Sequence, residues 1–209
     1  HDVYTGDPTF NDYRKKQWSL GYQFSHNLNS TWTLRQNVRW MHLSLDDASV
    51  FGAGLAPGST TNITRYAGLF QFNYSRFDID NTAQARFGTG PLEHTVLLGF
   101  QYSRQTTTDS EWLALAPRLN LYNPVYTPVT TAIFSGPTFL GHPNLYTAMS
   151  TVSTYAQDQI KWNRWVLTLG GREDWVNVRQ DNRGAGTQTN QDVSAFSGRV
   201  GLTYRGSYG

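Results

Sequence analysis

The stretch that decides the fold is 151–175, TVSTYAQDQIKWNRWVLTLGGREDW, in which two β-type runs meet at a very short polar connection. In the second run the apolar side chains take alternate positions: Trp165, Leu167, Leu169 and Trp175. The positions between them include Thr168, Gly170, Arg172 and Asp174. Side chains alternate across a strand with period 2, so this strand has one apolar face and one charged face. The connection 161–164 fits a tight hairpin. Tryptophans at the strand ends favour a wall between lipid and water.

The same alternation extends outward in both directions from this hairpin. It predicts seven strands, at 15–26, 31–45, 63–87, 92–107, two within 151–175, and 194–204. In 31–45 the apolar positions are broken by Gln36, which takes the place of an apolar residue. We therefore expect an all-β, antiparallel, up-and-down sheet.

The third predicted strand, 63–87, changes its pattern half-way along. Its distal part places Phe77 and Ile79 on the face opposite to Asp78, whereas Phe70, Phe72 and Tyr74 fall on the other parity. Either a bulge shifts the register or these three aromatics face inward. At about 3.3 Å per residue, its 25 residues would span about 80 Å, so one strand of this length must project well beyond a bilayer.

The predicted connections alternate in length along the chain. The short ones lie near 27–30, 88–91 and 162–164, and the long ones near 46–62, 108–150 and 180–193. Outer-membrane barrels have short periplasmic turns and long extracellular loops. Since such barrels usually close with an even number of strands, seven strands suggest part of a larger barrel.

Composition narrows the class of protein. Hydrophobic residues make up 38% of the 209, which is low for a packed core, yet aromatic residues reach 14%. No run approaches about 18 consecutive apolar residues, so the sequence excludes a membrane-spanning helix. There are no cysteines, and a net charge of +2 gives no argument for a nucleic-acid partner.

Seven short stretches resemble TonB-dependent siderophore receptors of the ferrichrome and hydroxamate type. They are WTLRQN (32–37), FDIDN (77–81), HTVLLGF (94–100), NLYNPVY (120–126), YAQDQ (155–159), LTLGGR (167–172) and GRVGL (198–202). They follow the order that this family shows through the middle of its barrel. Each motif alone is weak, but the series is specific and covers nearly the whole chain.

The resemblance implies that 1–209 is part of a barrel of about 22 strands, with the plug domain and the C-terminal strands outside this chain. It implies a receptor in the outer membrane of a Gram-negative bacterium that takes up ferric siderophores. The implied partners are the siderophore, the TonB–ExbB–ExbD complex acting through a missing N-terminal region, and outer-membrane lipid or lipopolysaccharide. No cofactor is expected, because the iron is carried as the ferric siderophore.

Aromatic side chains in the predicted loop 108–150 are the candidates for contact with a bulky iron chelate: Trp112, Tyr122 and Tyr126. The alternative is that such rings pack the loop onto itself or lie at the lipid interface. The remaining tryptophans are expected to form interfacial girdles: Trp18, Trp32, Trp40, Trp162, Trp165 and Trp175. A structural charge ladder is expected on the polar face, from Arg35, Arg39, Arg86, Arg172 and Arg199 with Asp78, Asp80 and Asp174.

Three other classes of protein stay open at this point. A passive porin would have a constriction loop and no plug. An outer-membrane barrel enzyme would need a Ser–His–Asp set or a similar cluster, and no such set, metal-binding motif or phosphate-binding loop is evident in the sequence. A soluble sheet would need a second packed layer, which nothing in the chain supplies. We therefore expect no enzymatic activity.

Overall fold

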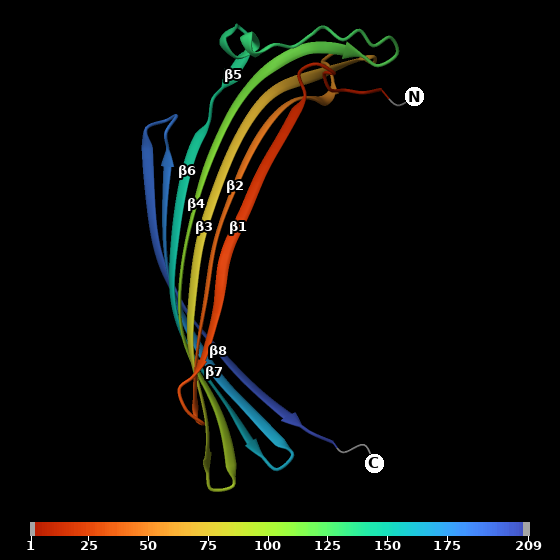
Figure 1. The fold of residues 1–209 in the computed structure, drawn as a ribbon. Helices are drawn as coiled ribbons and strands as arrows, with labels where there is room; N and C mark the ends of the chain where they lie inside the picture. The colour runs from red at the N-terminus through yellow and green to blue at the C-terminus, as the bar shows by residue number, and fades with distance from the viewer. Residues whose placement is uncertain (1–2, 207–209) are drawn as a thin grey trace.

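The computed structural model describes residues 3–206 and consists of one curved, open antiparallel sheet (Figure 1). Its strands are β1 (Asp12–Asn27), β2 (Trp32–Leu55), β3 (Asn62–Thr89), β4 (Leu92–Asn120), β5 (Phe139–Gly141), β6 (Asn144–Trp162), β7 (Trp165–Asn182) and β8 (Thr187–Tyr204). The seven long strands pair in chain order, and the three-residue β5 pairs only with β4. One 3-10 helix, η1 (Thr131–Ser135), lies between β4 and β5. Within the described range, no helix is long and apolar enough to cross a membrane.

All seven predicted strands are present, but each of the three predicted long loops is strand over more than half of its length. β2 continues to Leu55 and β4 to Asn120, and the connection after β7 shrinks to 183–186. The reason is that β3, whose predicted length is confirmed, runs beside them, so that the Ala-, Gly- and Ser-rich end of β2 pairs with it residue by residue as far as Gly52. Backbone pairing with a long neighbour outweighs the weak strand preference of those residues.

The three predicted short turns are confirmed at 28–31, 90–91 and 163–164. In the turn between β6 and β7, Asn163 has φ 52°, the left-handed conformation that asparagine tolerates better than most residues. These turns lie at one end of the sheet, and the connection between β4 and β6 lies at the other (Figure 1). The 28-residue β3 confirms that the strands are far longer than a bilayer is thick.

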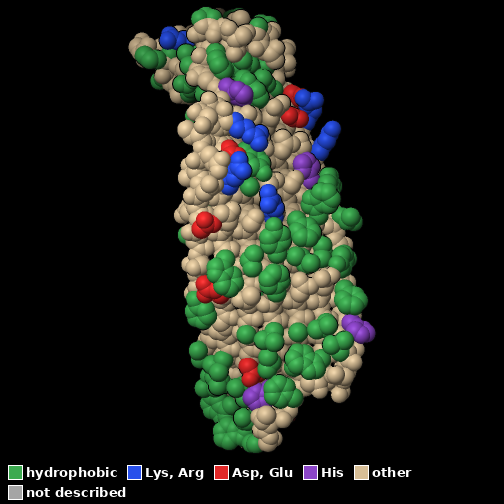
Figure 2. Space-filling model, turned by 90° about the vertical axis from the view of Figure 1, so that its left-hand side faces the viewer, with side chains coloured by type: hydrophobic (Ala, Val, Ile, Leu, Met, Phe, Trp, Pro, Cys, Tyr) green, Lys and Arg blue, Asp and Glu red, His purple; other side chains and the backbone are tan. Residues whose placement is uncertain are grey.

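The register gives the sheet an apolar face and a polar face. One row of paired residues on the apolar face is Tyr22, Val38, Ile79, Tyr102, Val152 and Trp175. The adjacent row, on the polar face, includes Gln23, Asn37, Asp80, Gln101, Ser153 and Asp174. Figure 2 shows hydrophobic side chains gathered over the lower half of the apolar face, with most of the charged side chains above them.

All six predicted girdle tryptophans have the parity of the apolar face. Trp165 and Trp175 stand ten positions apart on β7, which is about 33 Å along a strand. With the usual barrel tilt, this corresponds to about 25 Å along the membrane normal, the height of the apolar band of an outer-membrane barrel. The spacing therefore matches a membrane wall.

A small buried core covers the end of the sheet that carries the long connection. It consists of Val50, Ala67, Ala116 and Val129, with Phe10, Ile133 and Phe134 packed against it. The three strand residues among these lie on the apolar face, beyond the tryptophans. The segment before β1 and the connection between β4 and β6 are thus folded together onto that face.

A buried polar pair ties these two segments to the sheet. Arg65 is 0% exposed and donates to the carbonyl oxygens of Pro117 (2.8 Å) and Gly6 (3.0 Å). The carboxylate of Asp7 accepts the backbone N–H of Val129 at 3.2 Å. Burial alone would raise the pKa of Asp7, but this hydrogen bond and those from Thr9 and Phe10 hold the pKa below its ordinary value.

Candidate functional site on the polar face

The polar face carries a hydrogen-bonded network centred on Arg172. Its Nε donates to the carboxylate of Asp174 at 2.8 and 3.0 Å, and its Nη2 donates to Gln101 (2.9 Å) and Ser153 (2.8 Å). The guanidinium also lies 5.5 Å from the ring centroid of Tyr155. Because the network joins β4, β6 and β7, it fixes the spacing of the three strands and satisfies the charges on this face.

The predicted charge ladder is confirmed in part. Arg172 and Asp174 form the expected ion pair. Asp78, however, pairs with Arg76, a residue that the prediction omitted, through Nη2–Oδ1 at 2.7 Å. Asp80 accepts the hydroxyl of Tyr155 at 2.8 Å instead of pairing with an arginine. Three other predicted arginines donate to neutral side chains: Arg35 to Gln84, Arg39 to Ser19 and Arg199 to Gln157.

The parity change in β3 is resolved in favour of inward-facing aromatics. From Arg65 to Thr89, each residue of β3 pairs with one residue of β4, without a register shift. Phe70, Phe72 and Tyr74, which we call the aromatic row, therefore lie on the same face as Arg76 and Asp78. Sequence reasoning noted their parity but did not name them as site residues.

The aromatic row lies beyond the membrane-height band and among carboxylates. Tyr74 and Phe70 pair with residues of β2 that are three and seven positions past Trp40, which places them about 10 to 23 Å further along the strand. Phe70 shares its register row with Asp47 and Glu111. Phe72 shares its row with Asp109. A half-buried aromatic surface at the mouth of a sheet can hold a large ligand by ring contact.

Trp112, one of the three residues predicted from the sequence, lies in β4 and not in a loop. It shares a register row with Leu69 and Ala48, which places it on the apolar face, opposite to the aromatic row. Its ring stacks on His142, with centroids 4.0 Å apart and an interplanar angle of 15°. The structure therefore does not bring Trp112 onto the face of the aromatic row.

The other two predicted residues lie in the connection after β4. Tyr122 is 80% exposed, in a turn where the side-chain oxygen of Asn120 accepts its backbone N–H at 2.9 Å. The hydroxyl of Tyr126 donates to the backbone carbonyl of Tyr4 at 2.8 Å. This contact ties Tyr126 to the segment before β1. Contact of any of the three with a ligand stays a prediction.

No group of three or more His, Cys, Asp or Glu side chains within residues 3–206 could hold a metal ion. The polar face presents rings, amides and paired charges.

Comparison with known proteins decides the class. A family model described as "TonB dependent receptor-like, beta-barrel" matches residues 1–208. The chain belongs to this family. It is part of an outer-membrane β-barrel, so the apolar face meets lipid and the polar face lines the lumen. Because periplasmic turns are short in such barrels, the aromatic row lies on the lumenal wall at the extracellular end.

The curated relatives are siderophore receptors. The ferrichrome outer membrane transporter/phage receptor of Escherichia coli K12 is 31% identical over 213 residues, covering 93% of this chain and 28% of that protein. The ferrioxamine B receptor of Salmonella typhimurium is 26% identical over 205 residues, covering 96% of this chain and 28% of that protein. The chain therefore spans a little over a quarter of the length of these relatives.

Solved structures share the fold of this TonB-dependent receptor segment at lower identity. The siderophore receptor PiuA from Acinetobacter baumannii matches with a TM-score of 0.78 and 15% identity, over 98% of this chain and 32% of that chain. The ferric citrate transporter FecA in its unliganded form matches with a TM-score of 0.67 and 18% identity, over 94% of this chain and 26% of that chain. The predicted barrel architecture is confirmed by these matches.

Proposed function

We propose that the full-length protein imports a ferric siderophore of the hydroxamate class across the outer membrane. The main support for this function is the aromatic row, which places three rings on the lumenal wall at the extracellular end. The names of the relatives, which are receptors for ferrichrome and ferrioxamine, support the choice of ligand class.

In this proposal Phe70, Phe72 and Tyr74 contact the organic shell of the chelate. Tyr122, which is exposed at the same end of the sheet, and Tyr126 are further candidate contacts, whereas Trp112 lies on the opposite face of the sheet. The chelator supplies the ligands of the iron, so residues of this chain need not coordinate it and no cofactor is required. The protein carries out transport without a chemical reaction, and it is not an enzyme.

Energy and membrane contacts complete the proposal. The TonB–ExbB–ExbD complex acts through a region of the protein outside this chain. Basic side chains on the lipid-facing parity above the apolar band, among them Lys16, Arg104 and Arg179, would bind the phosphates of lipopolysaccharide. Figure 2 shows Lys and Arg side chains above the hydrophobic region of this face.

The test of transport is uptake of radiolabelled ferric ferrichrome and ferric ferrioxamine B by cells that carry the full-length gene. We expect uptake that requires the gene and disappears in a strain without TonB. Uptake that continues without TonB would support a passive channel instead and would contradict the proposal.

The test of the aromatic row is chelate binding to full-length Phe72→Ala and Tyr74→Ala variants. Removal of one contacting ring should raise the dissociation constant of the chelate about 5- to 30-fold, which corresponds to about 1–2 kcal/mol of binding free energy. Phe77→Ala is the matched control, since Phe77 lies on the same strand but faces lipid. Equal weakening by all three substitutions would contradict a contact through the aromatic row.

A further inference from the structure

The strand on one side of the aromatic row presents aliphatic side chains to the lumen. Leu45 of β2 pairs with Phe72, and Leu43 pairs with Tyr74. Both leucines are half-buried, as are the two rings. Paired residues of neighbouring strands lie about 5 Å apart and point to the same face. The leucines and the rings therefore form one apolar surface, with aliphatic side chains on β2 and aromatic rings on β3.

The strand on the other side of the aromatic row presents carboxylates. Asp109 of β4 pairs with Phe72, and Glu111 pairs with Phe70. Asp47 is the β2 partner of Phe70, so this ring has an acidic residue on each side. We call Asp47, Asp109 and Glu111 the acidic border. The apolar surface thus meets three formal negative charges within two successive rows of the lumenal parity.

The acidic border is not neutralised by the part of the chain that the structure describes. None of its three carboxylates forms an ion pair within residues 3–206. Lys15 is the β1 partner of Leu45, which puts it three strand spacings, about 14 Å, from Asp109. Arg76, on the same face, is already paired with Asp78 through Nη2–Oδ1 at 2.7 Å. The acidic border therefore keeps a net negative charge toward the lumen.

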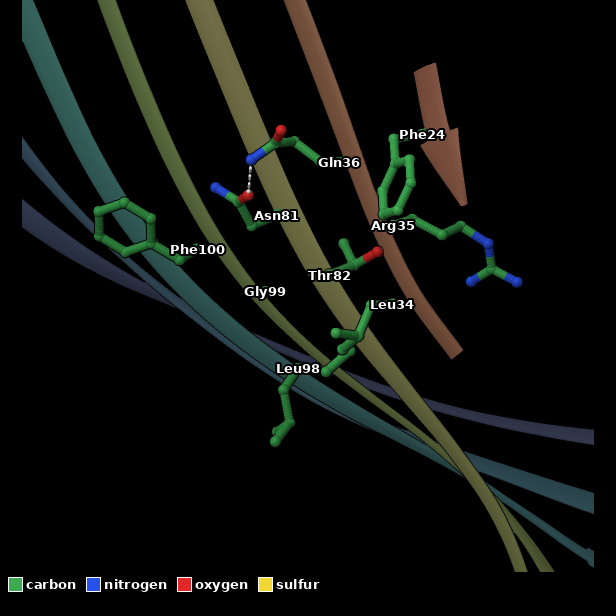
Figure 3. Close-up of a pocket in the computed structure, with 10 residues that line it drawn as sticks. Phe24, Leu34, Arg35, Gln36, Asn81, Thr82, Leu98, Gly99 and Phe100 are labelled. Atoms are coloured by element: carbon green, nitrogen blue, oxygen red, sulfur yellow. Dashed lines mark hydrogen bonds between the residues drawn. The ribbon is translucent and has the colours of Figure 1, made fainter. Parts of the chain in front are cut away.

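Polar groups of the lipid-facing parity are, by contrast, bonded to one another. Beside a hollow of about 470 Å³, the Nε2 of Gln36 donates to the Oδ1 of Asn81 at 2.6 Å (Figure 3). The two amides lie between the rings of Phe24 and Phe100 in one register row. Each amide thus has a partner within the sheet. The carboxylates of the acidic border lack a cationic partner among residues 3–206, so a positively charged group of a ligand can approach them from the lumen.

We propose that this wall selects ferric hydroxamate chelates that carry a positive charge on an aliphatic arm. The leucines and the rings contact the hydrocarbon of the arm, and Asp109 and Glu111 attract its cationic group. Ferric ferrioxamine B has this chemistry, because its hydroxamates neutralise the iron and its free amine adds an ammonium charge. An uncharged chelate cannot make the second contact. This inference rests on the proposed function, since it names which chelates the same site takes.

The test is isothermal titration calorimetry of the detergent-purified full-length receptor with two probes, ferric ferrioxamine B and its N-acetylated derivative. Acetylation removes the ammonium charge and leaves the iron-binding groups unchanged. The double variant Asp109→Asn/Glu111→Gln removes two charges of the acidic border at nearly constant shape. Asp46→Asn is the matched control, because Asp46 lies at the same height on β2 but on the opposite face to Asp47. Thermal melting of both variants checks that the barrel is folded.

We expect the wild type and Asp46→Asn to bind ferric ferrioxamine B about 3- to 30-fold more tightly than the acetylated probe, since two half-exposed charge contacts are lost on acetylation. In the double variant the two dissociation constants should become equal. Equal affinities in the wild type, or an unchanged ratio in the double variant, would overturn the selection by charge. Tight binding of both probes without preference would leave the transport proposal standing, whereas binding of neither probe would contradict the proposed ligand class as well.

Discussion

Replacing Arg65 by alanine should release the connection between β4 and β6 from the sheet. Arg65 is completely buried and anchors two segments at once, through the carbonyl oxygens of Gly6 and Pro117. Its removal also leaves the buried carboxylate of Asp7 without the nearby positive charge. The main effect should therefore be on the docking of these segments, while the barrel strands stay paired.

The magnitude follows from the two lost hydrogen bonds. Each bond from a charged donor contributes about 1.5–3 kcal/mol, and relief from burying the guanidinium offsets part of the sum. We expect a net loss of about 2–3 kcal/mol in local stability, which is a 30- to 150-fold rise in amide exchange, since about 1.4 kcal/mol is tenfold.

The assay is hydrogen–deuterium exchange of the full-length receptor, read at 121–138 and at the amide of Val129, which donates to Asp7. Arg14→Ala is the control, because the ion pair of Arg14 with Asp12 has side chains 69% and 58% exposed and should contribute little. Unchanged exchange in Arg65→Ala, or an equal change in Arg14→Ala, would show that Arg65 does not hold these segments on the sheet.

Three further predictions concern Gly99, Asp7 and His94. Gly99→Ala should reduce the free energy of unfolding of the full-length receptor by about 1–3 kcal/mol, because a β-carbon there collides with the ring of Tyr155. A lower melting temperature would report this loss. The docking that Asp7 stabilises should persist above the ordinary pKa of 3.8 and be lost as the pH falls through its lower folded-state pKa, which exchange or proteolysis of 121–138 can follow. His94→Ala should cost about 1–3 kcal/mol by removing the partner, at 2.7 Å, of the Asp158 carboxylate, and melting of the double variant with Asp158→Asn should show less than additive loss.

The period-2 pattern was enough to predict the two faces of the sheet. Alternation in 165–175 placed Arg172 and Asp174 on the polar face, where they pair, and placed Trp165 and Trp175 on the lipid face. Such a pattern is local, because each residue of a strand points opposite to its neighbours whatever its partner strand is. The polar exception Gln36 keeps the lipid-facing parity and bonds to Asn81.

The ends of strands and the docking of loops could not be predicted in this way. Residues 46–55 look like a loop by composition, and they form a strand because β3 beside them is long. The sequence likewise predicts a loop at Trp112, which lies in β4 because the long β3 pairs with it there. The contacts of Arg65 with Gly6 and of Tyr126 with Tyr4 join residues 59 and 122 positions apart, and no local pattern reports such contacts.

The orientation of this sheet, with one face toward lipid and the other toward the lumen of an outer-membrane barrel, underlies the proposed function. Its most direct test is nitroxide scanning of 76–80 in the full-length receptor in a bilayer, with collision rates measured for oxygen, which concentrates in hydrocarbon. We expect maxima at Phe77 and Ile79 and minima at Arg76, Asp78 and Asp80. Maxima at the charged positions, or rates without a period of two, would contradict it.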